Sequence, residues 1–220
     1  MTQTALFDLD GTLVDSATGI IANVHHAMRT IGRPLDDGQD LSWVVGPPLR
    51  DIFARLLDRF GGEGVEEAFA SYRATYDTVG LYESALYPGI QAALDDFQSA
   101  GWRLLVATSK PAAVARRMLA HFGLAGRFAA IYGSVADGAL AHKPELLGYI
   151  LDTQGLDPTR SVMIGDRSFD ISGAHANDVR AVGVLWGYGG AAELTQAGAD
   201  ALAERPEELL AACAGLLHGR

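Results

Sequence analysis

The sequence is short of cysteine, of long apolar runs and of lysine, and each shortage excludes a class of protein. Cys213 is the only cysteine in 220 residues, which excludes an intrachain disulfide and a thiolate metal cluster and favours a reducing compartment. No apolar run approaches the length of a membrane span, and the first residues lack the basic region and apolar segment of a signal peptide. We therefore expect a cytoplasmic protein.

Lysine occurs only at Lys110 and Lys143, and arginine supplies the other positive side chains. The formal net charge of -10 and the pI of about 4.9 argue against nucleic acid and anionic membranes as partners. A local cationic site can still bind a small anion. The hydrophobic content of 49% is typical of a globular protein, and we expect a monomer or a homodimer.

Apolar runs that alternate with helical patterns indicate an α/β fold. Strands are predicted near residues 5–7, 103–107, 129–132, 161–165 and 181–185, and helices near 90–100, 112–122, 144–153, 169–177, 191–197 and from 206. This alternation predicts right-handed crossovers and a Rossmann-like, doubly wound parallel sheet with helices on both faces.

Residues 16–81 interrupt the alternation with three successive helical patterns and no strand. We therefore predict a catalytic core domain of residues 1–15 and 82–220 and an inserted, all-helical cap domain of residues 16–81. Because both connections leave the sheet at one edge, the insert is expected to act as a lid that excludes water and contacts the substrate.

Two carboxylates, Asp8 and Asp10, close the first apolar run and are followed by Gly11. Ligands of open α/β sheets bind beyond the carboxyl ends of the strands, where these acids would lie. The period of two places both on one side of an extended backbone, and their like charges favour a shared cation. Mg²⁺ fits because it prefers oxygen ligands. The alternative is an acidic turn that caps the next helix.

Two later segments offer groups that bind phosphate. Thr108, Ser109 and Lys110 follow a predicted strand and provide hydroxyls and backbone amides, although a hydroxyl there can also simply cap the next helix. Lys143 precedes Pro144, which would open a helix. An ammonium there can bridge a phosphate and a carboxylate as a compact charge.

Asp166 ends another apolar strand, and Asp170 lies four residues further on. A turn into a helix at this point would bring both carboxylates to the edge that holds Asp8, where they would complete a metal site. Asp166 by itself is equally typical of a helix cap.

With these four segments the chain resembles the phosphatases of the haloacid dehalogenase superfamily, specifically the phosphoglycolate phosphatase-like group with a helical cap. The matching segments, in the family's order, are Asp8-Leu9-Asp10-Gly11-Thr12, Ala107-Thr108-Ser109-Lys110, His142-Lys143-Pro144 and Gly165-Asp166-Arg167-Ser168-Phe169-Asp170. Further similarity runs through Gly46-Pro47-Pro48-Leu49, Tyr87-Pro88-Gly89 and the stretch from Gly183 to Gly189. The resemblance covers essentially the whole chain.

The resemblance implies a reaction in two displacements. Asp8 would attack phosphorus and form an aspartyl-phosphate, while Asp10 would protonate the leaving alkoxide and then deprotonate the attacking water. Thr108 and Lys143 would bind the transferring oxygens, where charge stabilisation matters most.

The resemblance also implies a Mg²⁺ site. Asp166 would hold the ion together with the side chain of Asp8 and the backbone carbonyl of Asp10, and Asp170 would support the ligands. The remaining residues expected to bind substrate or phosphate are Gly11, Ser109 and, from the cap, Arg50.

Other reactions of the superfamily differ at identifiable positions. Dehalogenases lack the second aspartate, so Asp10 favours phosphoryl transfer, and phosphonatases use a cap lysine, which residues 16–81 lack. A phosphohexomutase stays open, with Arg50 as a contact to a second phosphate, although Arg50 also fits a solvated helix face. A phospho-accepting signalling domain without turnover uses similar groups, but the helical insert and Asp10 argue against it.

We therefore predict a Mg²⁺-dependent phosphatase acting on a small phosphorylated metabolite. Phosphoglycolate, a nucleotide monophosphate, a sugar phosphate and pyrophosphate all fit the expected core, because the choice among them belongs to the cap.

Overall fold

The computed structural model describes residues 2–135 and 138–218 and divides the chain into two compact units. One unit comprises residues 1–15 and 86–220, and the other comprises residues 16–85. The assignment of these parts as a catalytic core and a cap stays a prediction. No helix in the described ranges combines the length and hydropathy that a transmembrane helix requires.

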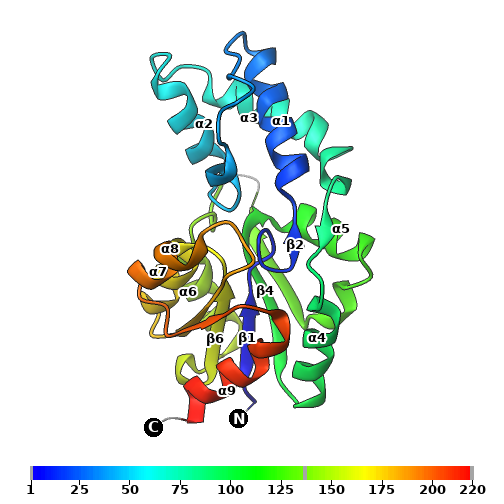
Figure 1. Ribbon diagram of the computed structural model, residues 1–220, viewed down its shortest axis with the longest axis vertical. Coiled ribbons are helices and arrows are strands. Elements are labelled where there is room, and N and C mark those ends of the chain that lie inside the picture. Colours follow the sequence, from blue (N-terminus) through cyan, green and yellow to red (C-terminus); the bar gives the residue numbers. More distant parts are fainter. Residues whose placement is uncertain (1, 136–137, 219–220) are drawn as a thin grey trace. The chain divides into compact units, whose positions relative to one another are not determined.

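A parallel sheet organises the larger unit, with six strands among the described residues in the order β5-β4-β1-β6-β7-β8 (Figure 1). These strands are β1 (Thr4–Phe7), β4 (Arg103–Pro111), β5 (Ala130–Ser134), β6 (Ser161–Gly165), β7 (Arg180–Val184) and β8 (Ala201–Ala203). In the centre, Phe7 of β1 lies opposite Val106 of β4 and Ile164 of β6. The predicted doubly wound α/β fold is confirmed.

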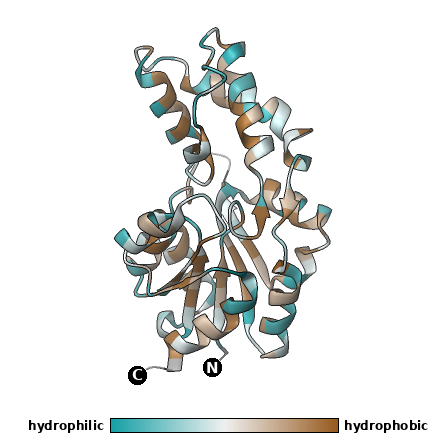
Figure 2. Cartoon of the chain, in the orientation of Figure 1, coloured by the Kyte–Doolittle hydropathy of each residue, from teal (hydrophilic) through white to brown (hydrophobic). Residues whose placement is uncertain are grey.

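Helices cover both faces of this sheet. They are α4 (Ile90–Ser99), α5 (Ala112–His121), α6 (Lys143–Gln154), α7 (Ser168–His175), α8 (Gly190–Gln196) and α9 (Leu209–His218). On one face, Leu6 and Met163 join a buried cluster with Leu147 of α6. On the other face, the Phe7 ring lies 5.5 Å from the Phe97 ring of α4. Strands that are buried on both faces have continuous apolar sequences, and the central strands are accordingly brown, the hydrophobic colour, in Figure 2.

Short elements account for the differences from the sequence prediction. β4 runs to Pro111 rather than ending at Ala107, and its register with β5 shifts between Thr108 and Pro111. Three other strands were not predicted because each has only two or three residues: β8, β2 (Val14–Asp15) and β3 (Ala85–Leu86), the last two forming a second sheet. The single-turn 3₁₀ segments are Ser42–Val44, Gly80–Tyr82, Ala125–Arg127, Pro158–Arg160 and Pro206–Glu208.

The smaller unit is built on α1 (Ala17–Thr30), α2 (Leu49–Asp58) and α3 (Val65–Tyr76), and residues 16–84, all described, contain no strand. Aromatic side chains fill its centre. The Tyr72 ring contacts Phe53 edge-on at 6.1 Å and stacks on Tyr76 at 4.9 Å. Tyr72 and Tyr76 are both buried, so they stabilise the unit by packing.

Candidate active site

The carboxyl edge of the central strands collects most of the residues predicted to act. Asp8 directly follows β1, Thr108 lies in β4, Lys143 begins α6 and Asp166 directly follows β6. Each of these four side chains belongs to a residue that is at most 2% exposed. Buried polar groups of this kind need partners, and their partners define the site.

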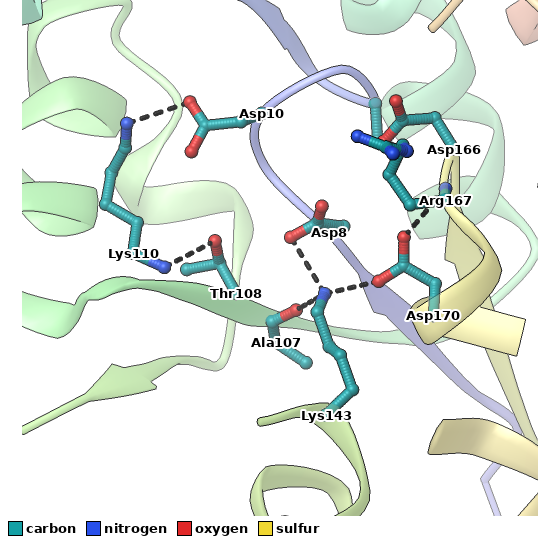
Figure 3. Close-up of polar contacts among 10 residues, drawn as sticks. Asp8, Asp10, Ala107, Thr108, Lys110, Lys143, Asp166, Arg167 and Asp170 are labelled. Carbon is teal, nitrogen blue, oxygen red and sulfur yellow. Dashed lines mark hydrogen bonds and ion pairs between the residues drawn. The ribbon is translucent and has the colours of Figure 1, made fainter. Parts of the chain in front are cut away.

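The ammonium of Lys143 connects three segments of the chain (Figure 3). Its Nζ lies 2.9 Å from Asp8 Oδ1 and 2.5 Å from Asp170 Oδ1, and it donates a hydrogen bond to the Ala107 carbonyl at 2.7 Å. Pro144 takes the second position of α6, where its missing N–H costs nothing, so the helix can start at the lysine. A single charge thereby links the end of β1 and the middle of β4 to α7.

Three carboxylates share this interior with that one ammonium. Asp8, Asp166 and Asp170 each offer an oxygen, and these oxygens all lie within 4.8 Å of one another. Asp170 is the third residue of α7 and accepts a hydrogen bond from the backbone N–H of Arg167 at 3.1 Å, which fixes the first turn of the helix. The acid that caps α7 is therefore Asp170 and not Asp166.

The cluster fits an oxygen-preferring divalent cation. Its donor set is carboxylate oxygen, and the excess negative charge calls for a cation. Asp166 is fixed from behind, because Oδ2 accepts a hydrogen bond from the Tyr188 N–H at 2.8 Å. Gly11, with φ of +84°, and Gly187 leave the space for its carboxylate: a Cβ at either position would overlap Asp166. The surrounding backbone thus fixes the position of the Asp166 carboxylate within the cluster.

Burial controls the ionisation of the cluster. It raises the pKa of Asp8 to about 7, with Lys143 opposing the rise and Asp170 adding to it. Burial also raises the pKa of Asp166 well above its usual value, with help from Asp170 and Asp8. For Lys143, burial disfavours the ammonium, yet Asp170 and Asp8 outweigh it and raise the pKa. Lys143 keeps its charge, while Asp8 and Asp166 favour their protonated forms unless a cation is bound.

Metal-free protein is expected to lose stability as the pH rises from about 5 to about 7. Folded Asp8, with its raised pKa, retains a proton that the unfolded chain has already released, so deprotonation favours unfolding in this interval. One such group changes the free energy of unfolding by at most about 1.4 kcal/mol per pH unit. Thermal unfolding in EDTA across this range measures the effect. Asp8→Asn should flatten the profile, and identical slopes in the two proteins would contradict the prediction.

Asp10 stands apart from the three clustered acids. Its Oδ1 pairs with the ammonium of Lys110 at 2.8 Å, and both side chains are less than a tenth exposed. Thr108 Oγ1 accepts a hydrogen bond from the Lys110 backbone N–H at 3.2 Å, and the cap of α5 is Pro111, so Thr108 and Ser109 do not cap that helix.

Two other predicted residues have partners that the sequence did not reveal. The Gly11 N–H donates to the Val14 carbonyl at 2.8 Å. Arg50, in the smaller unit, binds Glu66 through Nε at 2.7 Å and stacks 4.0 Å above the centre of the Phe69 ring. The expected contacts of Gly11, Ser109 and Arg50 with substrate stay predictions.

Sequence reasoning missed the residues that support Asp166 and α7. Arg167 binds Glu193 of α8 at 3.0 Å, and Glu193 also accepts the Ser168 N–H at 2.7 Å. Tyr188 bonds Asp166 through its backbone and Asp15 through its hydroxyl, at 2.8 and 2.7 Å. Backbone donors carry no sequence signal. The glycines around Tyr188 were the available indication, since they mark a close approach of the backbone.

The sequence is similar to a known family and to several proteins of named activity. Residues 5–184 match the model of one family, described as haloacid dehalogenase-like hydrolase. The chain is 41% identical over 189 residues to the 5′-nucleotidase of Pseudomonas aeruginosa, covering 86% of this chain and 85% of that protein. It is 34% identical over 191 residues to the phosphoglycolate phosphatase of Agrobacterium fabrum, covering 84% and 81%.

A third relative bears a different name. Over 188 residues the chain is 44% identical to the tyrosine-protein kinase PtkA of Mycobacterium tuberculosis, which covers 85% of this chain but only 63% of PtkA. The chain therefore spans less than two thirds of that relative's length. A solved structure of PtkA matches with a TM-score of 0.80 at 40% identity, covering 96% of this chain and 98% of the solved chain.

Proposed function

The chain belongs to the haloacid dehalogenase-like hydrolase family, and from this premise we propose that it is a Mg²⁺-dependent phosphatase of small phosphomonoesters. The observation that carries the proposal is the buried ammonium of Lys143 between Asp8 and Asp170, at strand ends where a phosphoryl group and a cation would meet. The relatives named 5′-nucleotidase and phosphoglycolate phosphatase support hydrolysis of a phosphate ester.

Each residue has a definite task in this reaction. Asp8 attacks the phosphorus while Asp10 gives its proton to the departing ester oxygen, so an alcohol leaves and an aspartyl-phosphate forms. Water then attacks that phosphorus and passes a proton to Asp10, which releases inorganic phosphate and restores Asp8. Lys143 and Thr108 stabilise the charge on the transferring oxygens, and Lys143 also holds the Asp8 carboxylate in place.

Mg²⁺ is the proposed cofactor. Asp8 and Asp166 would hold it, together with Asp170 or the backbone carbonyl of Asp10. When bound, the ion supplies positive charge that offsets both the carboxylates and the phosphoryl oxygens.

Metal removal is expected to silence the enzyme. EDTA should lower phosphate release by about 10²-fold or more, and excess Mg²⁺ should restore it, because the buried carboxylates otherwise repel a phosphate. The assay measures inorganic phosphate from phosphoglycolate, nucleoside 5′-monophosphates, sugar phosphates and pyrophosphate, ranked by kcat/KM. Activity that EDTA leaves unchanged would contradict the metal site, and no release from the whole panel would contradict the phosphatase.

Transfer to a protein tyrosine is a second candidate, favoured by the 44% identity to PtkA. In that reaction the phosphoryl group would pass to a tyrosine hydroxyl rather than to water. Incubation with γ-labelled ATP and a tyrosine peptide separates the two, because label on the peptide supports a kinase and free phosphate supports a phosphatase. Two further observations test the earlier alternatives. Isomerisation of a sugar phosphate from the substrate panel would indicate a mutase, and a long-lived phosphoprotein would indicate a signalling domain.

A further inference from the structure

The chain's second lysine also lies buried against a carboxylate of the site. Lys110 Nζ is 2.8 Å from Asp10 Oδ1, and the two side chains are 6% and 8% exposed. Figure 3 shows the pair beside Asp8, on the side away from Asp166 and Asp170. The backbone of Lys110 is tied to Thr108 in the last, irregular part of β4. Both ends of this lysine are thus held.

Burying an ion pair of this kind carries a free-energy cost. Moving two charges out of water carries a desolvation penalty that their attraction does not always offset, and ordering a lysine side chain costs conformational entropy. The pair also joins residues that are 100 positions apart, so no local structure explains it. What the pair does is fix the position of the Asp10 carboxylate.

The pair separates Asp10 from the other acids. Asp8, Asp166 and Asp170 bring oxygens within 4.8 Å of one another, and Asp10 is not among them. A carboxylate near a cation site is drawn towards the ion unless another cation competes for it. Lys110 is that competing cation for Asp10.

We propose that Lys110 is the positioning residue for proton transfer, holding the Asp10 carboxylate at the leaving group and away from the metal cluster. The inference rests on the proposed function. It concerns the step in which Asp10 protonates the departing oxygen, so its effect depends on how much the leaving group needs that proton. A nitrophenolate departs without one, whereas an unsubstituted phenolate is a poorer leaving group and gains from protonation.

The test compares p-nitrophenyl phosphate with phenyl phosphate in the presence of Mg²⁺. The measured quantity is the ratio of their kcat/KM values, which cancels any inactive fraction of a partly folded variant. Lys110→Met should raise this ratio at least about tenfold by slowing phenyl phosphate selectively. Lys110→Arg keeps a cation beside Asp10 and should leave the ratio within about threefold of wild type, because a charge-assisted bond to the carboxylate is retained.

A double-mutant cycle identifies the residue through which Lys110 acts. Asp10→Asn should raise the ratio as well, and Asp10→Asn with Lys110→Met should be no worse than Asp10→Asn alone, because the effects of coupled residues do not add. An unchanged ratio in Lys110→Met, or losses that multiply in the double variant, would overturn the proposal. A KM increase equal for both esters would instead make Lys110 a substrate contact, which also overturns it.

The control variant is Arg205→Met, which removes a cation paired with Glu208 at an exposed position. It should leave the ratio unchanged. Failure of the proposed function looks different from failure of this inference, since wild-type protein would then release no phosphate from either ester.

Discussion

Asp8→Asn protein is expected to release phosphate at least about 10³-fold more slowly than wild type, because an amide oxygen cannot form the covalent intermediate. The substitution keeps the shape of the side chain. Burial already disfavours the Asp8 carboxylate and raises its pKa to about 7, and Lys143 keeps Asp170 as a charged partner, so the fold should survive the substitution. The measurements are steady-state phosphate release with saturating Mg²⁺ and the thermal unfolding midpoint of the same sample.

The matched control is Asp96→Asn, the same substitution at an exposed position of α4. It should retain wild-type turnover. If Asp8→Asn turned over at a rate near that of Asp96→Asn, Asp8 would not be the nucleophile. If instead its unfolding midpoint collapsed, the loss of activity would report folding and not chemistry.

Lys143→Met is expected to have the second largest effect, on both stability and activity. Methionine matches the length of the lysine stem but leaves Asp8, Asp170 and the Ala107 carbonyl without the ammonium. Breaking a buried pair by removing one partner costs about 3 kcal/mol or more of unfolding free energy. Loss of the charge that faces the transferring oxygens should lower phosphate release by about 10²-fold or more. Denaturant titration and kinetics measure the two losses.

The pH dependence separates lost charge from lost packing. At acidic pH the folded Asp8 carboxyl, whose pKa burial raises to about 7, is protonated and needs the ammonium less, so the stability difference between wild type and Lys143→Met should shrink towards pH 5 and grow towards pH 8. An equal difference at both pH values would mean that the methionine merely packs badly, and the electrostatic role would have to be abandoned.

The sequence predicted the strands that matter most for the site because they are buried on both faces. The apolar run at residues 161–165 predicts a strand, and β6 occupies the same residues. β8 escaped prediction because three residues give no periodicity to recognise. The extension of β4 to Pro111 escaped because a polar Thr-Ser-Lys segment resembles a loop, although pairing with β5 keeps it extended.

The part of the site that could be predicted follows from one rule, that the carboxyl ends of parallel strands lie at the same edge of the sheet. That rule brings Asp8, Thr108 and Asp166 to one edge without any knowledge of distances. It does not say which partner each group takes. Asp170 binds Lys143 and also closes the first turn of α7, and only the packing of α6 beside α7 produces that arrangement. Partner choice depends on side-chain rotamers and helix packing, which a single sequence does not specify.

Both lysine side chains of the chain are withdrawn from solvent, at 6% and 1% exposure for Lys110 and Lys143. Reagents that acylate or methylate primary amines should therefore find no ready lysine on the folded protein. Each lysine also precedes a proline, Pro111 or Pro144, a bond that trypsin cuts poorly. The rate of lysine labelling, followed by mass spectrometry of the intact chain, would therefore measure how frequently the site opens to solvent.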